Sequence, residues 1–143
     1  MSLPKGAAKA AREFARAILR RKWDEVPPLC TTALRATLTV EALAAEFGWS
    51  ALGPRLRREH IAATGEDEAM VPELDPPRRF EVFEVEERDP PAGHDPRIPL
   101  GWVEVDFLPS QGSEFDACYN CFLAFVDEAG PRVAAYDVEG ATE

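Results

Sequence analysis

The sequence is poor in the residues that most often carry out chemistry. It holds two histidines, three cysteines and two tyrosines among 143 residues. It contains no glycine-rich phosphate loop and no nucleophile elbow. Neither His60 nor His94 has an identifiable carboxylate, serine or cysteine partner. The sequence therefore carries no enzyme signature, and it predicts neither a metal site nor a cofactor.

Long apolar runs are also absent. No segment approaches the ~18 consecutive apolar residues of a membrane span, and the N-terminal stretch lacks the apolar region of a signal peptide. Three cysteines are an odd count, which is simplest to interpret as reduced thiols in a cytoplasm. We therefore expect a cytoplasmic protein that makes no membrane contact.

Positive charge is scarce, and negative charge is concentrated in the second half. The net charge is −10, and residues 61–143 hold 20 of the 26 acidic residues. Phosphate contacts need a basic surface, so this balance argues against nucleic-acid binding. The acidic half is interpreted either as the solvated outer positions of a sheet or as an acidic face for a basic partner.

The first half of the chain has the patterns of helices. Apolar residues at helical spacing predict a helix over residues 4–22, and acidic residues before two prolines predict a short one over 24–31. Thr39 is typical of the residue that caps a third helix, which Gly48 ends in a left-handed conformation. The inward stripe of this helix is expected to be Val40, Leu43, Ala44 and Phe47. Gly53-Pro54 then stops any further turn. Residues 55–79 show no clear pattern: residues 55–64 fit either a strand or a short helix, and the acidic residues 65–77 are interpreted as a loop.

The second half has the patterns of strands. Residues 80–87 alternate weakly, whereas Gly101–Leu108 alternates cleanly and places Trp102, Glu104 and Asp106 on the outer face. Residues 118–126 are apolar on both faces, which predicts a strand in the middle of a sheet. A hairpin turn around Gly130 leads into the last strand. Helices before strands predict one α+β domain over residues 1–143, with three helices on a curved, mainly antiparallel sheet of four to six strands. This arrangement forms a cone with a central pocket.

This layout resembles the superfamily of nuclear transport factor 2 and ketosteroid isomerase. The resemblance lies in Lys22-Trp23-Asp24 after the first helix, in the Thr39–Leu43 helix start, and in the closing hairpin of residues 122–138. It implies a helix-lined pocket and a homodimer formed through the outer face of the sheet. Members include enzymes, carriers and proteins without known activity, so the resemblance assigns no catalytic residue.

Six residues are candidates to line a pocket for a small apolar ligand: Trp23, Phe47, Trp49, Tyr119, Asn120 and Tyr136. Asn120 breaks an apolar strand, so it either orients a ligand or makes a structural hydrogen bond. The tyrosines and tryptophans either face the pocket or pack the core.

The Cys118-Tyr119-Asn120-Cys121 motif is interpreted as two structural thiols, because residues i and i+3 of a strand face opposite ways. Asp106 and Asp116 are candidate general bases only if they are buried beside the pocket.

Three functions remain open at this stage. The first is a non-catalytic module for ligand binding or protein interaction. The second is a small-molecule isomerase or dehydratase that uses a pocket carboxylate and tyrosine donors. The third is an acidic inhibitor or immunity-type protein that binds a basic partner.

Overall fold

The computed structural model describes residues 3–73, 75–85, 88–108 and 119–140. Four α-helices come first: α1 (Ala7–Leu19), α2 (Thr32–Arg35), α3 (Val40–Phe47) and α4 (Trp49–Thr64). Four strands follow: β1 (Arg79–Val85), β2 (Gly101–Leu108), β3 (Tyr119–Asp127) and β4 (Pro131–Gly140). The predicted α+β class is confirmed, with four α-helices in the described residues rather than three.

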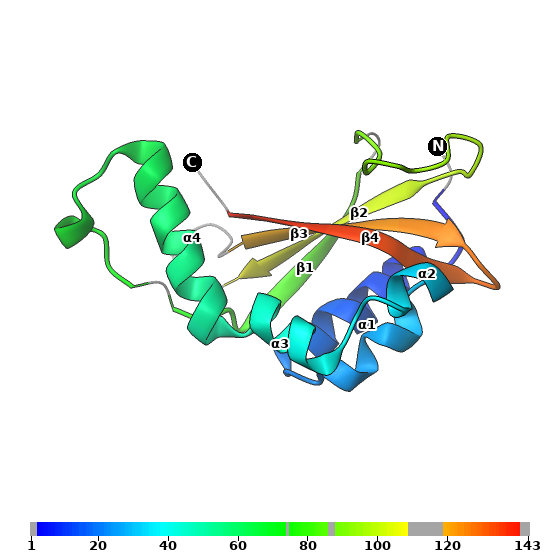
Figure 1. The fold of residues 1–143 in the computed structure, drawn as a ribbon, viewed down its shortest axis with the longest axis horizontal. Coiled ribbons are helices and arrows are strands. Elements are labelled where there is room, and N and C mark those ends of the chain that lie inside the picture. The colour runs from blue at the N-terminus through cyan, green and yellow to red at the C-terminus, as the bar shows by residue number, and fades with distance from the viewer. Residues whose placement is uncertain (1–2, 74, 86–87, 109–118, 141–143) are drawn as a thin grey trace.

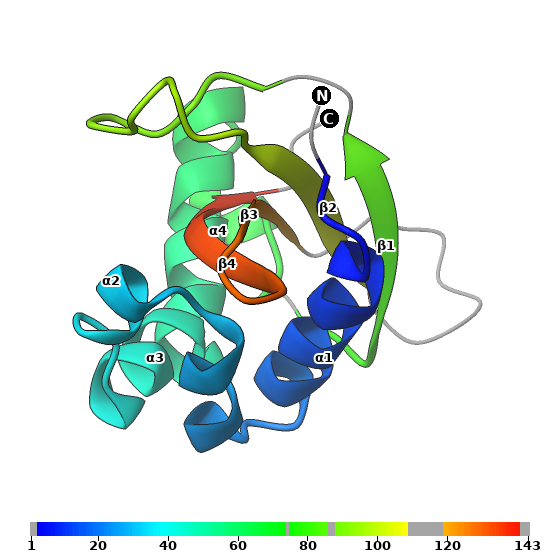
Figure 2. The ribbon, with the colours of Figure 1, turned by 90° about the vertical axis from the view of Figure 1, so that its right-hand side faces the viewer.

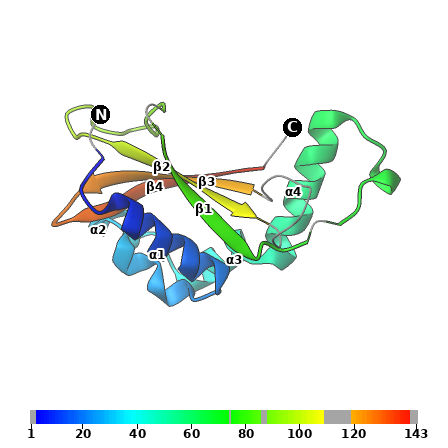
Figure 3. The same cartoon turned by 180° about the vertical axis from the view of Figure 1, so that it is seen from behind.

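The strands form one antiparallel sheet in the order β1-β2-β3-β4, so β1 and β4 are its edges. Helices α1, α2 and α3 lie under one face, which we call the inner face, and α4 stands at one end of the sheet (Figures 1 and 3). Seen from the side, α1 lies along β1 and β2 (Figure 2). The segment of residues 88–100 lies on the other side of the sheet, over part of the outer face (Figure 1).

Helix α1 packs closely on the inner face because its buried stripe is mostly alanine. Ala11, Phe14 and Ala15 are fully buried, and Ile18 is 4% exposed. Small side chains let the helix backbone approach the sheet, and Phe14 fills the remaining space. The predicted stripe of apolar residues on this helix is confirmed.

The predicted helix over residues 24–31 is wrong. Two 3-10 turns, Trp23–Glu25 and Pro27–Leu29, occupy this stretch instead. Two adjacent prolines lack the backbone N–H groups that an α-helix needs, so only single turns form here. Helix α2 then begins after Thr31, whose Oγ1 accepts a hydrogen bond from the Leu34 backbone at 3.1 Å.

Helix α3 begins as the sequence predicts, because Thr39 Oγ1 accepts a hydrogen bond from the Ala42 backbone at 3.0 Å. Its end differs from the prediction. Gly48 has φ −61° and ψ 130°, which is not left-handed, and this single residue separates α3 from α4. Val40, predicted to face inward, is 45% exposed.

Helix α4 runs through Gly53-Pro54, which was predicted to stop it. Pro54 lies near the start of the helix, so the missing N–H costs one bond to the carbonyl of Ser50, an exposed residue that water can reach. The helix ends at Gly65, which has the left-handed φ of 72°. Residues 55–64, where the sequence left strand and helix open, are therefore helical.

Gly53 makes room for the indole ring of Trp49. A Cβ atom at this position would lie 2.9 Å from Cε2 and Nε1 of Trp49. Glycine-to-alanine changes inside helices usually stabilise a protein. We expect Gly53→Ala instead to destabilise this one by about 1–2 kcal/mol, because the ring must move. Urea unfolding and tryptophan fluorescence measure the effect, with Ser50→Ala as a control on the same helix. A variant more stable than the wild type would contradict the prediction.

Strand β3 is buried on both faces over most of its length, as the sequence predicts. A hairpin joins it to β4, in which Gly130 has φ 110° and its N–H donates to Asp127 Oδ1 at 3.0 Å. The edge of β4 is partly covered: Cys30 forms an isolated bridge with Val133, and Thr31 N–H donates to the Val133 carbonyl at 2.9 Å. This segment therefore continues the hydrogen bonding of the sheet past its last strand.

Candidate interaction surface on the outer face of the sheet

Outer-face side chains alternate with those that face the helices. On β2, Val103, Val105 and Phe107 are fully buried in the core between helices and sheet. Trp102, Glu104 and Asp106 therefore point to the outer face, which confirms the predicted orientation. The carboxylates of this strand are thus kept away from the core.

The strand register aligns the outer residues in two neighbouring rows across the sheet. The first row is Phe83, Glu104, Phe122 and Asp137. The second row is Glu81, Asp106, Asn120 and Glu139. We call these residues the outer-face rows. Five of them carry a carboxylate, and strands β1, β2 and β4 bring these five together from distant parts of the sequence.

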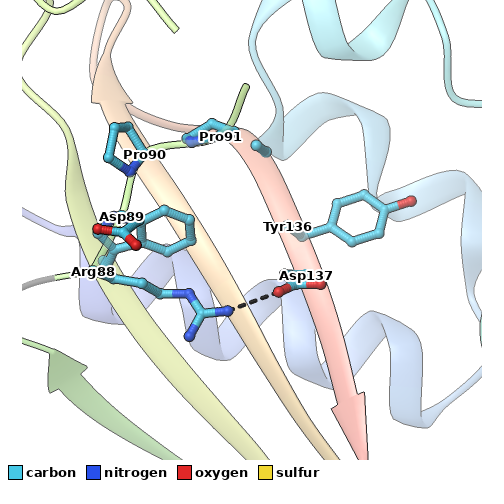
Figure 4. A pocket seen from close by; sticks show the side chains of 8 residues that line it. Arg88, Asp89, Pro90, Pro91, Tyr136 and Asp137 are labelled. Carbon is cyan, nitrogen blue, oxygen red and sulfur yellow. Dashed lines mark hydrogen bonds and ion pairs between the residues drawn. The ribbon is translucent and has the colours of Figure 1, made fainter. Parts of the chain in front are cut away.

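Arg88 reaches over the β3–β4 side of the outer-face rows. Its Cζ atom lies 3.8 Å from the ring centroid of Phe122 and 5.4 Å from that of Trp102. Its Nη2 donates to Asp137 Oδ2 at 2.7 Å, drawn in Figure 4, and also to Glu139 Oε2. Stacking on aromatic rings and charge-assisted hydrogen bonds together fix the guanidinium.

Asn120 joins two carboxylates of β2. Its Nδ2 donates to Glu104 Oε2 at 3.1 Å and to Asp106 Oδ1 at 2.5 Å. Burial, a hydrogen bond with Glu104 and the charge of Glu104 raise the pKa of Asp106 to about 7, against a smaller lowering by Asn120. The charge of Glu81 is the smallest contribution to the same rise. Asp106 therefore retains its proton up to near-neutral pH.

A cavity of about 460 Å³ adjoins Arg88 on the outer face. It is lined by residues of the segment after β1 and of strands β2 and β4: Arg88, Asp89, Pro90, Pro91, Trp102, Ala135, Tyr136 and Asp137. In Figure 4 the ring of Tyr136 points away from Asp137 across β4. Only the Tyr136 backbone side thus faces this cavity, whose walls combine carboxylates with proline and tryptophan surfaces.

The ring of Tyr136 lies in the core instead, near Phe14 at 6.1 Å and Phe47 at 5.5 Å between ring centroids. Burial, then a hydrogen bond with Glu46, raise the pKa of the Tyr136 hydroxyl. Glu46 Oε1 is buried and has no partner among the described residues. Glu46 does not line the cavity beside Arg88 or either of the two cavities that Trp49 borders. Glu46 and Tyr136 thus form a carboxylate–tyrosine pair, and the rings of Phe14 and Phe47 pack beside it.

The predicted pocket residues do not converge on one large cavity. Phe47, Trp49 and Tyr119 line a space of only about 30 Å³ between α1, α3 and the sheet, which is the volume of one water molecule. Trp49 also borders a cavity of about 550 Å³ between α4 and residues 68–76. Trp23 packs against the core, while Asn120 belongs to the outer face.

The cysteines of the described residues are buried free thiols. Burial raises the pKa of Cys30 to about 11 and raises that of Cys121 as well. A thiol whose pKa is raised is a poor nucleophile and metal ligand. Cys118 of the predicted motif and the candidate base Asp116 lie outside the described residues.

Sequence reasoning missed four of the residues that define this surface: Arg88, Phe122, Asp137 and Glu139. The alternation of Asp137 and Glu139 in the last strand was a readable signal for a charged outer face. Arg88 gave no such signal in the sequence, because it follows β1 in irregular sequence and only the tertiary fold determines its position.

Within the described ranges, no group of three or more His, Cys, Asp or Glu side chains is arranged to hold a metal ion. The helices described there are all too short or too polar to cross a membrane. Comparison with protein-family models, with curated proteins and with solved structures gives no match.

Proposed function

We propose that this protein is a non-catalytic interaction module whose outer sheet face binds a basic surface of a protein partner. The observation that supports this most is the way Arg88 is bound. Phe122 lies beneath its guanidinium, and Asp137 and Glu139 pair with it. These are the contacts that an arginine of a partner needs.

Charge supports the same choice of partner. The outer-face rows carry five carboxylates, and in the described ranges the cations paired with them are Arg88 and Arg79. Carboxylates gathered on one face steer a basic partner and reject an acidic one. The third function in the sequence analysis, an acidic inhibitor or immunity-type protein, is a special case of this proposal.

The test is binding of short blocked peptides of opposite charge, followed by amide chemical shifts. We expect an arginine- and lysine-rich peptide to bind, to shift signals of β1–β4 outer residues, and to weaken with salt. The double variant Glu104→Gln/Glu139→Gln should bind about fivefold more weakly. A matched double variant, Glu13→Gln/Glu41→Gln, removes two exposed charges from the helices and should bind normally. Equal losses in both variants, or shifts confined to the helices, would refute the proposal.

The predicted homodimer through the outer face stays a prediction. Two copies joined there would bring two sets of carboxylates together, which opposes association when they are ionised. We expect dimers through this face only where the carboxylates are protonated, and light scattering across the acidic range measures this. A stable dimer at neutral pH would favour self-association over a basic partner.

The resemblance to the nuclear transport factor 2 superfamily is part of the proposal. Its support is the arrangement of N-terminal helices on one face of an open antiparallel meander. The enzyme alternative now involves Glu46 and Tyr136, and the packing of aromatic rings around that pair gives it less support.

A further inference from the structure

The arrangement that binds Arg88 is present twice in the outer-face rows. Phe122 on β3 lies opposite Asp137 on β4, and Glu139 follows two residues later on the same face. Phe83 on β1 lies opposite Glu104 on β2, and Asp106 likewise follows two residues later. Because β1 and β3 run in the same direction, the two sets are related by a shift of two strands, about 9.6 Å.

The two sets differ in what covers them. Phe122 is half-buried under the guanidinium of Arg88. Phe83 is 45% exposed, which is unusual for a phenylalanine of a sheet. In the part of the chain that the structure describes, no lysine or arginine pairs with Glu104 or Asp106; their partners are the amide of Asn120 and each other. The first set is occupied from within the molecule, and the second set is open.

We infer that Phe83, Glu104 and Asp106 form a second guanidinium position, which accepts an arginine side chain of the partner beside Arg88. This inference rests on the proposed function and names the chemistry that the same face recognises. The aromatic ring supplies a stacking surface, and the two carboxylates supply acceptors at its side. The partner's arginine then repeats the contacts that Arg88 makes two strands away.

Arginine fits this position better than lysine does. The guanidinium is planar, so it stacks flat on a phenyl ring while its edge donates several parallel hydrogen bonds. An ammonium group is compact and strongly hydrated, and it gains charge attraction without stacking. Glu104 and Asp106 lie two residues apart on the same face of β2, an arrangement that suits the several donors along the edge of a guanidinium group. The side chain of Phe83 is therefore what distinguishes the two cations.

Position in the sheet also favours an external ligand. β1 is an edge strand, so Phe83 is accessible from the side as well as from above. The segment of residues 88–100 crosses the outer face beyond β2, where Arg88 contacts Trp102 and Phe122. A partner approaching over β1 thus meets the open set before it meets the occupied one.

The experiment compares two blocked peptides that are identical except that all arginines of one are lysines in the other. Binding is measured by amide chemical shifts of the full-length protein. We expect the arginine peptide to bind about threefold more tightly, with its largest effects at Phe83 and Glu104. Phe83→Leu keeps an apolar side chain but removes the ring, so it should abolish the preference, with a larger loss of affinity for the arginine peptide than for the lysine peptide. Val40→Ala, at an equally exposed apolar position on α3, should alter neither affinity.

The outcomes distinguish the guanidinium position from the acidic interaction surface on which it rests. Equal affinity for both peptides in the wild type, with losses in Glu104→Gln, refutes the guanidinium position while the acidic interaction surface stands. An unchanged arginine preference in Phe83→Leu refutes it as well. Failure of both peptides to bind refutes the interaction surface itself. Arg88→Ala frees the first set, so we expect it to raise arginine-peptide affinity. A lowered affinity would contradict the equivalence of the two sets and so refute the guanidinium position.

Discussion

Replacement of Phe14 by alanine is expected to lower the free energy of unfolding by about 3–5 kcal/mol. Phe14 is fully buried and links α1 to the sheet, where its ring lies 6.1 Å from that of Tyr136. The surrounding residues belong to different elements and cannot all move into the vacated space, so a cavity remains. A loss of this size is a large part of the roughly 5–15 kcal/mol that stabilises a typical protein.

Urea unfolding at neutral pH measures this loss. Phe14→Leu retains most of the volume and should lose only about 1–1.5 kcal/mol, so it remains measurable if the alanine variant does not fold. Phe83→Ala, on the exposed outer face, should change stability by less than about 1 kcal/mol. Comparable losses for Phe14→Ala and Phe83→Ala would mean that the space between helices and sheet is not closely packed.

Replacement of Asp106 by asparagine is expected to stabilise the protein by about 1–2 kcal/mol above neutral pH and to have little effect near pH 4. Burial and the neighbouring Glu104 raise the pKa of Asp106 from 3.8 to about 7 in the folded protein. The folded state therefore binds this proton more tightly than the unfolded state does. The wild type loses stability as the pH rises from about 4 through about 7, and asparagine has no proton to lose. The magnitude is well below that of the full shift, because Asp106 is partly exposed.

Thermal or urea unfolding of both proteins between about pH 4 and pH 8 tests the sign. The amide oxygen of asparagine can still accept the hydrogen bond from Asn120 Nδ2, so the geometry of the cluster is retained. Asp24→Asn removes one exposed charge far from the cluster and controls for the change in net charge. A gain in stability that is the same at every pH would contradict the assignment of the proton to Asp106.

The elements with strong local patterns were predictable from sequence. The alanine stripe of α1, the Thr39 cap of α3 and the alternation of β2 each depend on interactions within a few residues. Helix α4 was not predicted, because Gly53-Pro54 normally ends a helix. Here Trp49 packs over Gly53, and the proline lies where one lost hydrogen bond is replaced by water. Tertiary packing thus overrode a local signal that is usually reliable.

The candidate surface was only partly predictable. Alternation placed Trp102, Glu104 and Asp106 on the outer face, and the acidic second half suggested a basic partner. The rows themselves depend on strand register, and a slip of one residue would reverse every side chain. Asn120 was predicted to line a pocket or make a structural bond; its observed partners, Glu104 and Asp106, lie 16 and 14 residues away in sequence, respectively. The position of Arg88 depends on the path of residues 88–100 over the sheet, and no short sequence pattern encodes that path.

The bridge between Cys30 and Val133 has a consequence for how copies of this protein behave at high concentration. Exposed sheet edges are the usual templates for strand-by-strand fibre growth. Along β4, the Thr31 N–H already donates to the Val133 carbonyl, so an incoming strand must displace it. At the other margin, Arg79, Glu81 and Glu84 place charges along β1. Both edges of the sheet therefore carry features that oppose pairing with a strand of another copy, even though Phe83 is exposed on the outer face.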